Sequence, residues 1–440
     1  MKVVIKGYGF NNSPSGVGGI GGNVHAPASK SSMQRACAAA LVRKGESIIR
    51  NPGKSNDDKA GLNVIKALGA EVIINNEELI IKSEGVKPVS SVVNNGEAGL
   101  GIRMFTPIVA LSENEMMING EGSLLTRPMD FFDEVMPQLG VQIASNNGKL
   151  PIKLQGPLQP NNIEIDGSLS SQFLTGLLLA YAAVDARNVT IKVNNLKSKP
   201  YVDLTLSVME SFLLKVPENR NYEEFYFDET PVIDTDDFVD YTVEGDWSGG
   251  AFLIVFGAIA GNIKVAGLDI ASTQADKKIL EALESCGARI NIGDKIIEVS
   301  NSSLGDGGLS AFEFDATDCP DLFPPLAALA ANCKGTTKIT GVHRLAHKES
   351  NRGLTIQEEL SKMNIKVELN DNVMLIEGTT DIKATTVHSH HDHRIAMMCA
   401  LLALKANGET TIEVAEAINK SYPDFYRHLQ SLGVTVETEI

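Results

Sequence analysis

The chain has 440 residues, a formal net charge of −16 at pH 7 and a hydrophobic fraction of 43%. This length favours two domains, because a single compact core rarely grows so large. The hydrophobic fraction is typical of a soluble globular protein. The negative charge argues against a nucleic-acid or anionic-membrane binder, but a small anionic ligand that meets only local charge is still allowed.

The chain contains no segment that predicts export or membrane insertion. The N-terminal MKVVIKGYGF has no apolar core of signal-peptide length, and the longest apolar runs, 173–184 and 251–261, are too short to span a bilayer. The five cysteines are scattered, without a CxxC pair or zinc spacing. We therefore expect buried thiols in a reducing cytoplasm.

The first motif along the chain is GVGGIG at residues 16–21, which matches the glycine pattern of dinucleotide-binding loops. That function needs a helix to open at the motif and an acid about 20 residues later. Here Pro27 interrupts the segment, and the next acid, Glu46, lies beyond the following helix. We interpret the motif as a flexible glycine-rich segment near a domain hinge.

One pattern recurs along the rest of the chain: a helical segment ends near Leu-Gly, and two short alternating strands follow around a turn. About six such units, three on each side of residue 245, predict an α/β fold of two similar halves. A cleft between two halves is a natural ligand site, although the period also fits an α/β protein without one. The copies lie at residues 67–82, 139–154, 286–299 and 363–377, with a truncated copy at 432–440 and a diverged one at 212–227.

Cations and hydroxyls gather at predicted helix starts in this acidic chain. A helix N-terminus presents free N–H groups and partial positive charge, so added Ser, Gln, Lys or Arg side chains make an oxyanion site without a metal. Any one of these places could be a helix cap beside a surface cation, but the set indicates a substrate with several anionic groups. They are Lys30, Ser31 and Arg35; Arg103; Arg127; residues 166–180 with Gln172; Ser198 and Tyr201; and residues 343–352, 390–394 and 419–426.

Together these motifs resemble the 5-enolpyruvylshikimate-3-phosphate (EPSP) synthase family, in the family's order and over nearly the whole chain. The resemblance implies the enolpyruvyl transferase fold, which is two domains of three repeated α/β units in an inverse α/β barrel-like form, with the active site in the interdomain cleft. The motifs are SKSSMQR (29–35), SNDD (55–58), GEAGLGIR (96–103), TRP (126–128), DGSLSSQFLTGLLL (166–179), SKPYVD (198–203), EGDWSGGAF (244–252), DCPDLFPPLAALAA (318–331), RLAHKESNR (344–352), DHRIAM (392–397) and NKSYPDF (419–425).

The resemblance also implies the domain limits and the reaction. Residues 27–245 would form the domain on the shikimate 3-phosphate side, and residues 1–26 with 246–440 the catalytic and phosphoenolpyruvate side. The enolpyruvyl group of phosphoenolpyruvate would pass to the 5-hydroxyl of shikimate 3-phosphate by addition and elimination, with release of phosphate. We expect a cytoplasmic monomer without cofactor or metal, and glyphosate as a candidate inhibitor.

The site residues follow from the same resemblance. Asp321 would take the proton of the 5-hydroxyl, and Glu349 and Lys30 would move protons at the methylene carbon and the departing phosphate. For Asp321 alone, a helix-capping role is an equal alternative. The expected shikimate 3-phosphate set is Lys30, Ser31, Arg35, Ser170, Ser171, Gln172, Ser198, Tyr201, Asp321, Arg344 and Lys348. The expected phosphoenolpyruvate set is Lys30, Gly99, Arg127, Gln172, Glu349, Arg352, His393, Arg394 and Lys420.

Some positions depart from the family pattern and two alternatives stay open. Glu97, Leu100, Arg344 and Asn351 differ from the usual residues, which bears on ring contacts and helix position but not on the reaction. Gly99 keeps the small residue that leaves room for glyphosate, but Leu100 and Met104 could shift that helix, so glyphosate sensitivity stays open. One alternative is the sister enzyme that modifies UDP-N-acetylglucosamine, but its reactive cysteine is absent from GEGSLLTRPMD (120–130). The other is a non-catalytic anion-binding relative.

The tract HSHHDH (388–393) holds four of the eight histidines. Histidine-rich tracts bind zinc or nickel, so a metal site is one interpretation. No cysteine or acid stands at ligand spacing from the tract, so we expect no metal function. We expect His393 near phosphoenolpyruvate and the other histidines on a solvated loop.

Overall fold

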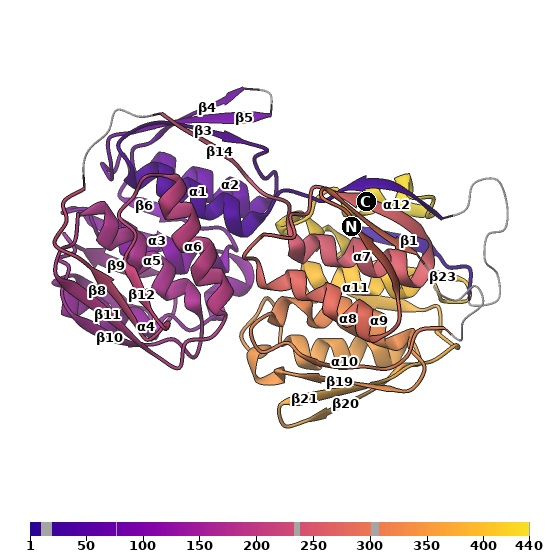
Figure 1. The fold of residues 1–440 in the computed structure, drawn as a ribbon. Coiled ribbons are helices and arrows are strands. Elements are labelled where there is room, and N and C mark those ends of the chain that lie inside the picture. Colours follow the sequence, from indigo (N-terminus) through magenta and orange to yellow (C-terminus); the bar gives the residue numbers. More distant parts are fainter. Residues whose placement is uncertain (10–19, 76, 233–237, 301–307, 440) are drawn as a thin grey trace. The chain divides into compact units, whose positions relative to one another are not determined.

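The computed structural model describes residues 1–9, 20–75, 77–232, 238–300 and 308–439. It divides into two compact units, drawn in Figure 1. Unit 2 is the contiguous segment Ala28–Glu244, whereas unit 1 combines Met1–Pro27 with Gly245–Ile440. The chain passes between the units twice, after Pro27 and after Glu244, and a backbone hydrogen bond of 2.8 Å lies on each side of these boundaries. Ser29 N–H donates to Glu244 O in unit 2, and Asp246 N–H donates to Pro27 O in unit 1.

Within the described residues, each unit has three sheets of four strands with one shared topology: a parallel pair followed by two antiparallel pairs. In unit 2 the sheets are β14 (Val239–Thr242), β3 (Gly45–Arg50), β5 (Glu78–Ser83), β4 (Glu71–Asn75); β6 (Val92–Asn94), β7 (Glu115–Asn119), β9 (Ile152–Gln155), β8 (Gln142–Ser145); and β10 (Ile163–Asp166), β11 (Val189–Asn194), β13 (Glu224–Phe227), β12 (Glu218–Arg220). In unit 1 they are β16 (Arg289–Ile292), β17 (Ile296–Ser300), β15 (Asn262–Ala266), β2 (Gly21–His25); β18 (Glu313–Asp315), β19 (Thr336–Thr340), β21 (Val373–Glu377), β20 (Lys366–Asn370); and β22 (Thr386–His388), β23 (Glu409–Glu413), β1 (Lys2–Lys6), β24 (Val436–Glu439).

The predicted hairpins are confirmed. Antiparallel pairs β4–β5, β8–β9, β12–β13, β16–β17 and β20–β21 fall on the recurring pattern. The glycine before each of three hairpins has the left-handed backbone that the cap requires, with φ of +104° at Gly69, +76° at Gly140 and +82° at Gly287. Asn364, at φ +65°, does the same before β20.

The truncated sixth repeat is completed by the start of the chain. In this sheet β1 takes the place of the second hairpin strand, because it pairs antiparallel with both β23 and β24. Val3 and Ile5 on β1 are fully buried. In the glycine-rich segment, residues 16–19 lie outside the described residues, and Gly21 begins a strand that pairs in parallel with β15 rather than a helix.

Helices form the buried centre of each unit and the sheets lie outside them (Figure 1), which is the inverse of an α/β barrel. Every residue of α3 (Gly99–Val109), α7 (Trp247–Ala260), α9 (Phe323–Ala331) and α11 (His393–Ala403) is buried, as expected for helices that are apolar on all sides. No described helix has the length and apolarity to cross a membrane. The central helices are α1 (Lys30–Val42), α3 (Gly99–Val109) and α5 (Ser171–Ala183) in unit 2, and α7 (Trp247–Ala260), α9 (Phe323–Ala331) and α11 (His393–Ala403) in unit 1.

The remaining helices keep an exposed face. They are α2 (Asn56–Ala67), α4 (Asp130–Val135), α6 (Lys199–Ser211), α8 (Ile279–Ser285), α10 (Arg352–Lys362) and α12 (Phe425–Ser431). Short 3-10 helices bridge several of the connections, namely η1 (Gly122–Thr126), η2 (Met136–Leu139), η3 (Ala275–Lys278), η4 (Pro320–Leu322), η5 (Val342–Arg344) and η6 (Ala415–Lys420).

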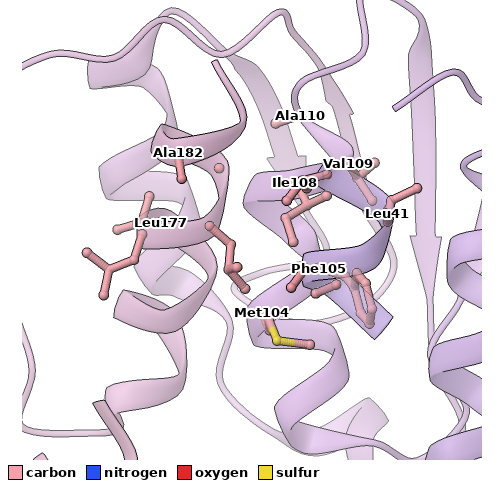
Figure 2. Packing of buried hydrophobic residues seen from close by; sticks show 14 of the residues in the cluster. Leu41, Met104, Phe105, Ile108, Val109, Ala110, Leu177 and Ala182 are labelled. Atoms are coloured by element: carbon pink, nitrogen blue, oxygen red, sulfur yellow. The ribbon is translucent and has the colours of Figure 1, made fainter. Parts of the chain in front are cut away.

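Figure 2 shows the apolar contact between the central helices of unit 2. Leu41 of α1, Phe105 and Ile108 of α3 and Leu177 of α5 are all fully buried in this core. Because close-packed interiors resist displacement, the core fixes the N-terminal turns of these helices relative to one another. Those turns carry the polar residues described next.

Candidate active site

In unit 1, three cationic side chains contact one carboxylate. Asp321 lies in η4, and its Oδ1 is 2.7 Å from Arg352 Nη1 and 3.2 Å from Lys348 Nζ, while its Oδ2 accepts from Arg394 Nη2 at 3.1 Å. Burial opposes ionisation, but the charges of Arg394, Lys348 and Arg352 outweigh it and hold the pKa of Asp321 well below its usual range. The N-caps of η4 and α9 are Cys319 and Leu322, and neither helix start has a side-chain cap hydrogen bond, so the capping alternative for Asp321 is wrong.

Arg352, the first residue of α10, is fully buried and donates hydrogen bonds to three carboxylates. Its Nε donates to Asp392 Oδ2 at 2.8 Å, and its Nη2 donates to Asp392 Oδ1 at 3.2 Å and to Glu349 Oε2 at 2.6 Å. With the bond to Asp321, four of its five N–H donors are engaged by the protein. Arg352 therefore joins the starts of α10 and α11 to η4, because Asp392 is the N-cap of α11.

Arg394, in the first turn of α11, has unsatisfied hydrogen-bond donors. Its Nη2 contacts Asp321, but its buried Nε and Nη1 have no hydrogen-bond partner among the described residues. Leaving a buried charged donor unpaired is costly, so such groups in native proteins call for an explanation such as an absent ligand. His393 before it and Lys420 at the end of η6 are also buried.

Further charged groups of unit 1 surround Asp321. Burial lowers the pKa of Lys348 and of Arg344. Asp276 in η3 is fully buried and accepts a hydrogen bond from the Ser248 hydroxyl. Burial, together with the nearby negative charge of Asp321, raises the pKa of Asp276 to about 6.

In unit 2, the first polar group lies where α1 begins. Lys30 Nζ forms an ion pair with Asp57 Oδ2 at 2.9 Å, and both side chains are largely buried. Arg35 is 1% exposed, and it donates to Thr205 Oγ1 at 2.9 Å, Ser31 O at 2.9 Å and Tyr201 O at 3.1 Å. Burial lowers the pKa of Arg35 to about 10. Arg35 thus links α1 to α6 by hydrogen bonds, and only some of its guanidinium N–H groups remain to bind a ligand.

The second polar group of unit 2 lies where α3 and α5 begin. Gln172 Oε1 accepts from Arg103 Nη1 at 2.9 Å, so its amide NH₂ is the side left to donate to an anion. Ser170 is the N-cap of α5 and accepts from Gln172 N–H at 3.2 Å. A Cβ on Gly99 would lie 2.3 Å from Arg127 Nη1, so a larger residue at this position would displace the guanidinium end of Arg127.

The two groups of unit 2 are joined by a hydrogen bond of 2.9 Å between the hydroxyls of Thr175 on α5 and Thr205 on α6. Ser198 is the N-cap of α6, with a left-handed backbone at φ +56°. The expected residues of unit 2 are Lys30, Ser31, Arg35, Gly99, Arg127, Ser170, Ser171, Gln172, Ser198 and Tyr201. Those of unit 1 are Asp321, Arg344, Lys348, Glu349, Arg352, His393, Arg394 and Lys420.

Sequence reasoning missed several partners of these residues. Asp57 and Asp392 stand inside motifs that the sequence singled out, next to residues that were chosen, whereas Arg103 was named as a cation at a helix start but left out of the expected binding sets. Asp276 and Thr205 lie outside every motif, and only their burial and contacts identify them. The expectation of a solvated histidine loop is wrong for His390, whose Nε2 lies 2.5 Å from the buried carboxylate of Glu359.

A family model and curated relatives of this chain all carry one description. The family model described as EPSP synthase (3-phosphoshikimate 1-carboxyvinyltransferase) matches residues 14–429. A relative from Clostridium novyi is 34% identical over 428 residues, covering 95% of this chain and 96% of its own length. A relative from Methanocorpusculum labreanum is 33% identical over 423 residues, covering 96% of this chain and 98% of its own length. Both are named 3-phosphoshikimate 1-carboxyvinyltransferase.

Solved structures share the fold. An EPSP synthase from Acinetobacter baumannii has a TM-score of 0.78 and 22% identity, and the match covers 99% of this chain and 100% of that one. The enolpyruvyl transferase NikO from Streptomyces tendae has a TM-score of 0.75 and 19% identity, and the match covers 99% of this chain and 98% of that one.

Proposed function

This chain belongs to the EPSP synthase family of 3-phosphoshikimate 1-carboxyvinyltransferases, and we propose on that basis how its own residues carry the reaction. The enzyme transfers the enolpyruvyl group of phosphoenolpyruvate to the 5-hydroxyl of shikimate 3-phosphate and releases phosphate. Addition gives a tetrahedral intermediate, and elimination restores the double bond. The product serves aromatic amino-acid biosynthesis through chorismate.

Asp321 is the proposed base for the 5-hydroxyl. An alcohol is a poor nucleophile until a positioned base takes its proton. In the structure the carboxylate is ionised but weakly basic, because three cations contact it. Anionic groups of the substrates would draw Lys348 and Arg394 away from Asp321, and its basicity would then rise toward that of a free carboxylate. This three-cation contact is the observation that supports the proposal most strongly.

Arg394 is the proposed centre of the phosphoenolpyruvate clamp in unit 1. Its two buried, unpaired donor positions suit a bidentate carboxylate or phosphate. Lys420 and His393 would assist it, and Arg352 would add its one remaining N–H while it holds Glu349 and Asp392 in place. Fixed cations of this kind stabilise the charge that develops in the intermediate. Glu349 would exchange a proton with the methylene carbon.

Unit 2 is proposed to hold shikimate 3-phosphate. Ser170, Ser171, Gln172 and Ser198 stand at the starts of α5 and α6, where backbone N–H groups and side-chain donors favour a phosphate. Tyr201, Ser31 and Arg35 would contact the rest of the molecule, as would Arg344 and Lys348 of unit 1. Gly99, Arg127 and Lys30 would face phosphoenolpyruvate, with Lys30 donating a proton to the departing phosphate.

Four further features are part of the proposal. The enzyme acts as a monomer, works in the cytoplasm and uses no cofactor, and glyphosate is its candidate inhibitor, in competition with phosphoenolpyruvate. Size-exclusion chromatography with light scattering tests the first, and glyphosate titration at several phosphoenolpyruvate concentrations tests the last.

Release of inorganic phosphate tests the reaction and its residues. The purified chain is given phosphoenolpyruvate with either shikimate 3-phosphate or UDP-N-acetylglucosamine, in EDTA. We expect release only with shikimate 3-phosphate. Asp321→Asn and Lys30→Met should each lower kcat by at least about 100-fold, the usual scale for a lost proton-transfer group.

Matched controls use exposed residues of the same two units. Asp315→Asn removes an exposed carboxylate that accepts a hydrogen bond from Thr317 N–H, and Lys44→Met removes an exposed ammonium just beyond the C-terminal end of α1. Both should keep wild-type kcat. Release only with the nucleotide sugar would identify the sister reaction, and no release with either acceptor would leave an anion-binding relative.

A further inference from the structure

A second cluster of ligand-type side chains lies in unit 1, about two helical turns along α10 from Arg352. Glu358 and Glu359 of α10 face His390, which lies between β22 and α11. One ligand atom from each residue lies within 4.8 Å of the others. His390 Nε2 is 2.5 Å from Glu359 Oε1 and 3.9 Å from Glu358 Oε2.

The centre of this cluster is a fully buried carboxylate. Glu359 is 0% exposed, and its Oε2 accepts from His388 N–H at 2.9 Å. Burying an ionised carboxylate is costly unless it is paired or coordinates a metal. The group is therefore a built feature of the fold rather than an exposed acidic patch.

A cation already lies against both carboxylates. Lys362 Nζ is 2.7 Å from Glu359 Oε1 and 3.0 Å from Glu358 Oε1. The Lys362 side chain is 38% exposed, so its ammonium can move into water without disturbing the core. The two carboxylates thus define a place for positive charge, which the partly exposed Lys362 ammonium occupies.

Two further histidines, His388 and His391, lie near the cluster of Glu358, Glu359 and His390. The His388 ring lies 5.0 Å from the His390 ring and 6.0 Å from the His391 ring, measured between centroids. The cluster therefore combines two carboxylates from a helix with histidines from the adjoining turn. Zn²⁺ accepts both imidazole nitrogen and carboxylate oxygen as ligands.

We propose that Glu358, Glu359 and His390 bind one Zn²⁺ ion, with Lys362 as a competing internal cation. Two carboxylate oxygens and one imidazole nitrogen supply three ligands, and water completes a tetrahedron. Nitrogen ligation disfavours Mg²⁺, which prefers six oxygens. Zinc ligands at about 2.1 Å are about 3.4 Å apart, so the 2.5 Å contact would open and the 3.9 Å contact would close.

The proposed site braces two helices that matter for the reaction. Zn²⁺ would join α10, which begins at Arg352, to the turn that leads into Asp392 and α11. The metal would stabilise unit 1 without taking part in catalysis. The phosphate-release assay runs in EDTA, so failure of the proposed reaction and failure of this site are distinguished.

Zinc binding by the full-length, tag-free and EDTA-stripped chain tests the proposal, with isothermal titration calorimetry as the measurement. We expect one Zn²⁺ per chain and no heat from Mg²⁺. Glu358→Gln and His390→Asn should each weaken binding at least tenfold. Lys362→Met should strengthen it several-fold, because the competing ammonium is gone.

The matched control is His391→Asn. His391 is in the same tract and has the same left-handed backbone, φ +58° against +52° at His390, a conformation that asparagine tolerates. We expect its affinity to stay within twofold of wild type. All five cysteines are buried, so the folded chain offers no exposed thiol to zinc. Circular dichroism melting without metal checks that each variant is folded.

Three results would overturn the site. Equal losses in His390→Asn and His391→Asn would show an adventitious histidine tract. Unchanged affinity in Glu358→Gln would show that the carboxylates do not ligate, and unchanged affinity in Lys362→Met would show that no cation is displaced. Glu358 is 54% exposed, so its variant does not depend on repacking the core.

Discussion

Arg352 shows how one side chain organises unit 1. Its guanidinium contacts Asp321, Glu349 and Asp392, which come from η4, the segment before α10 and the N-cap of α11. A planar fork can hold three carboxylates in fixed directions, whereas the ammonium of lysine is a single point charge. The position therefore requires arginine for its geometry as well as for its charge.

We predict that Arg352→Lys lowers kcat/KM by at least about 100-fold and the free energy of unfolding by about 3 kcal/mol, because buried carboxylates lose their partners. Steady-state kinetics and urea unfolding measure both effects. Arg427→Lys is the control, since Arg427 is 71% exposed in its ion pair with Asp424. It should change stability by less than about 1 kcal/mol. A lysine variant with half of the wild-type activity would contradict the role of the fork.

At the scale of one element, the start of α2 is held by a buried capping box. Ser55 Oγ accepts from Asp58 N–H, and Asp58 Oδ2 accepts from Ser55 N–H at 3.0 Å and from its hydroxyl at 2.6 Å. Burial raises the pKa of Asp58 to about 6, although the hydrogen bonds from Ser55 oppose the shift. The same turn supplies Asp57, the partner of Lys30.

This raised pKa makes stability depend on pH. Between about pH 4 and pH 6 the native state binds more protons at Asp58 than the unfolded state, whose carboxyl titrates near 3.9. Its contribution to the free energy of unfolding therefore falls as pH rises through this window. Asp58→Asn does not titrate, so its stability relative to wild type should rise by at most about 3 kcal/mol from pH 4 to pH 7.

Urea unfolding at four pH values checks this prediction. Ser55→Ala serves as the control: it should lower stability by about 1 kcal/mol through the lost cap and retain a pH slope from Asp58. Parallel profiles for Asp58→Asn and wild type would contradict the prediction.

For the whole molecule, the two units differ in how the chain builds them. Unit 2 is one contiguous segment with its own core, and unit 1 needs β1 between β23 and β24. Pro27 and Asp246 are joined by a backbone hydrogen bond of 2.8 Å, so the ends of the two parts of unit 1 are adjacent.

We predict that each unit folds alone. Residues 28–244 expressed as one chain, and residues 1–27 joined to 245–440 by a short Gly-Ser linker, should each unfold cooperatively on heating. Circular dichroism and calorimetry measure this. The matched control is 245–440 without residues 1–27, which should be less cooperative because β23 and β24 lose the strand between them. A non-cooperative unit 2 would show that its core is insufficient.

The sequence by itself determined the repeats, and it named the residues of the proposed site. Hairpins and caps depend on neighbours in the chain, so Gly69, Gly140 and Gly287 could be identified as left-handed caps without a structure. Ser29 and Ser170 are helix N-caps in segments that the sequence had marked as polar helix starts. Family motifs supplied the proposed roles of the charged residues, including Asp321.

Only the tertiary structure decided which distant groups meet. β1 completes a sheet with β23 and β24 at the other end of the chain, and Glu359 meets His390 although 30 residues separate them. Asp392 and Asp321 share the fork of Arg352, which spacing along the chain could not show. Local pattern fixes an element through bonds between near neighbours, whereas these contacts arise from packing of buried helices, and the buried charges then pair with whatever opposite charge the packing brings within reach.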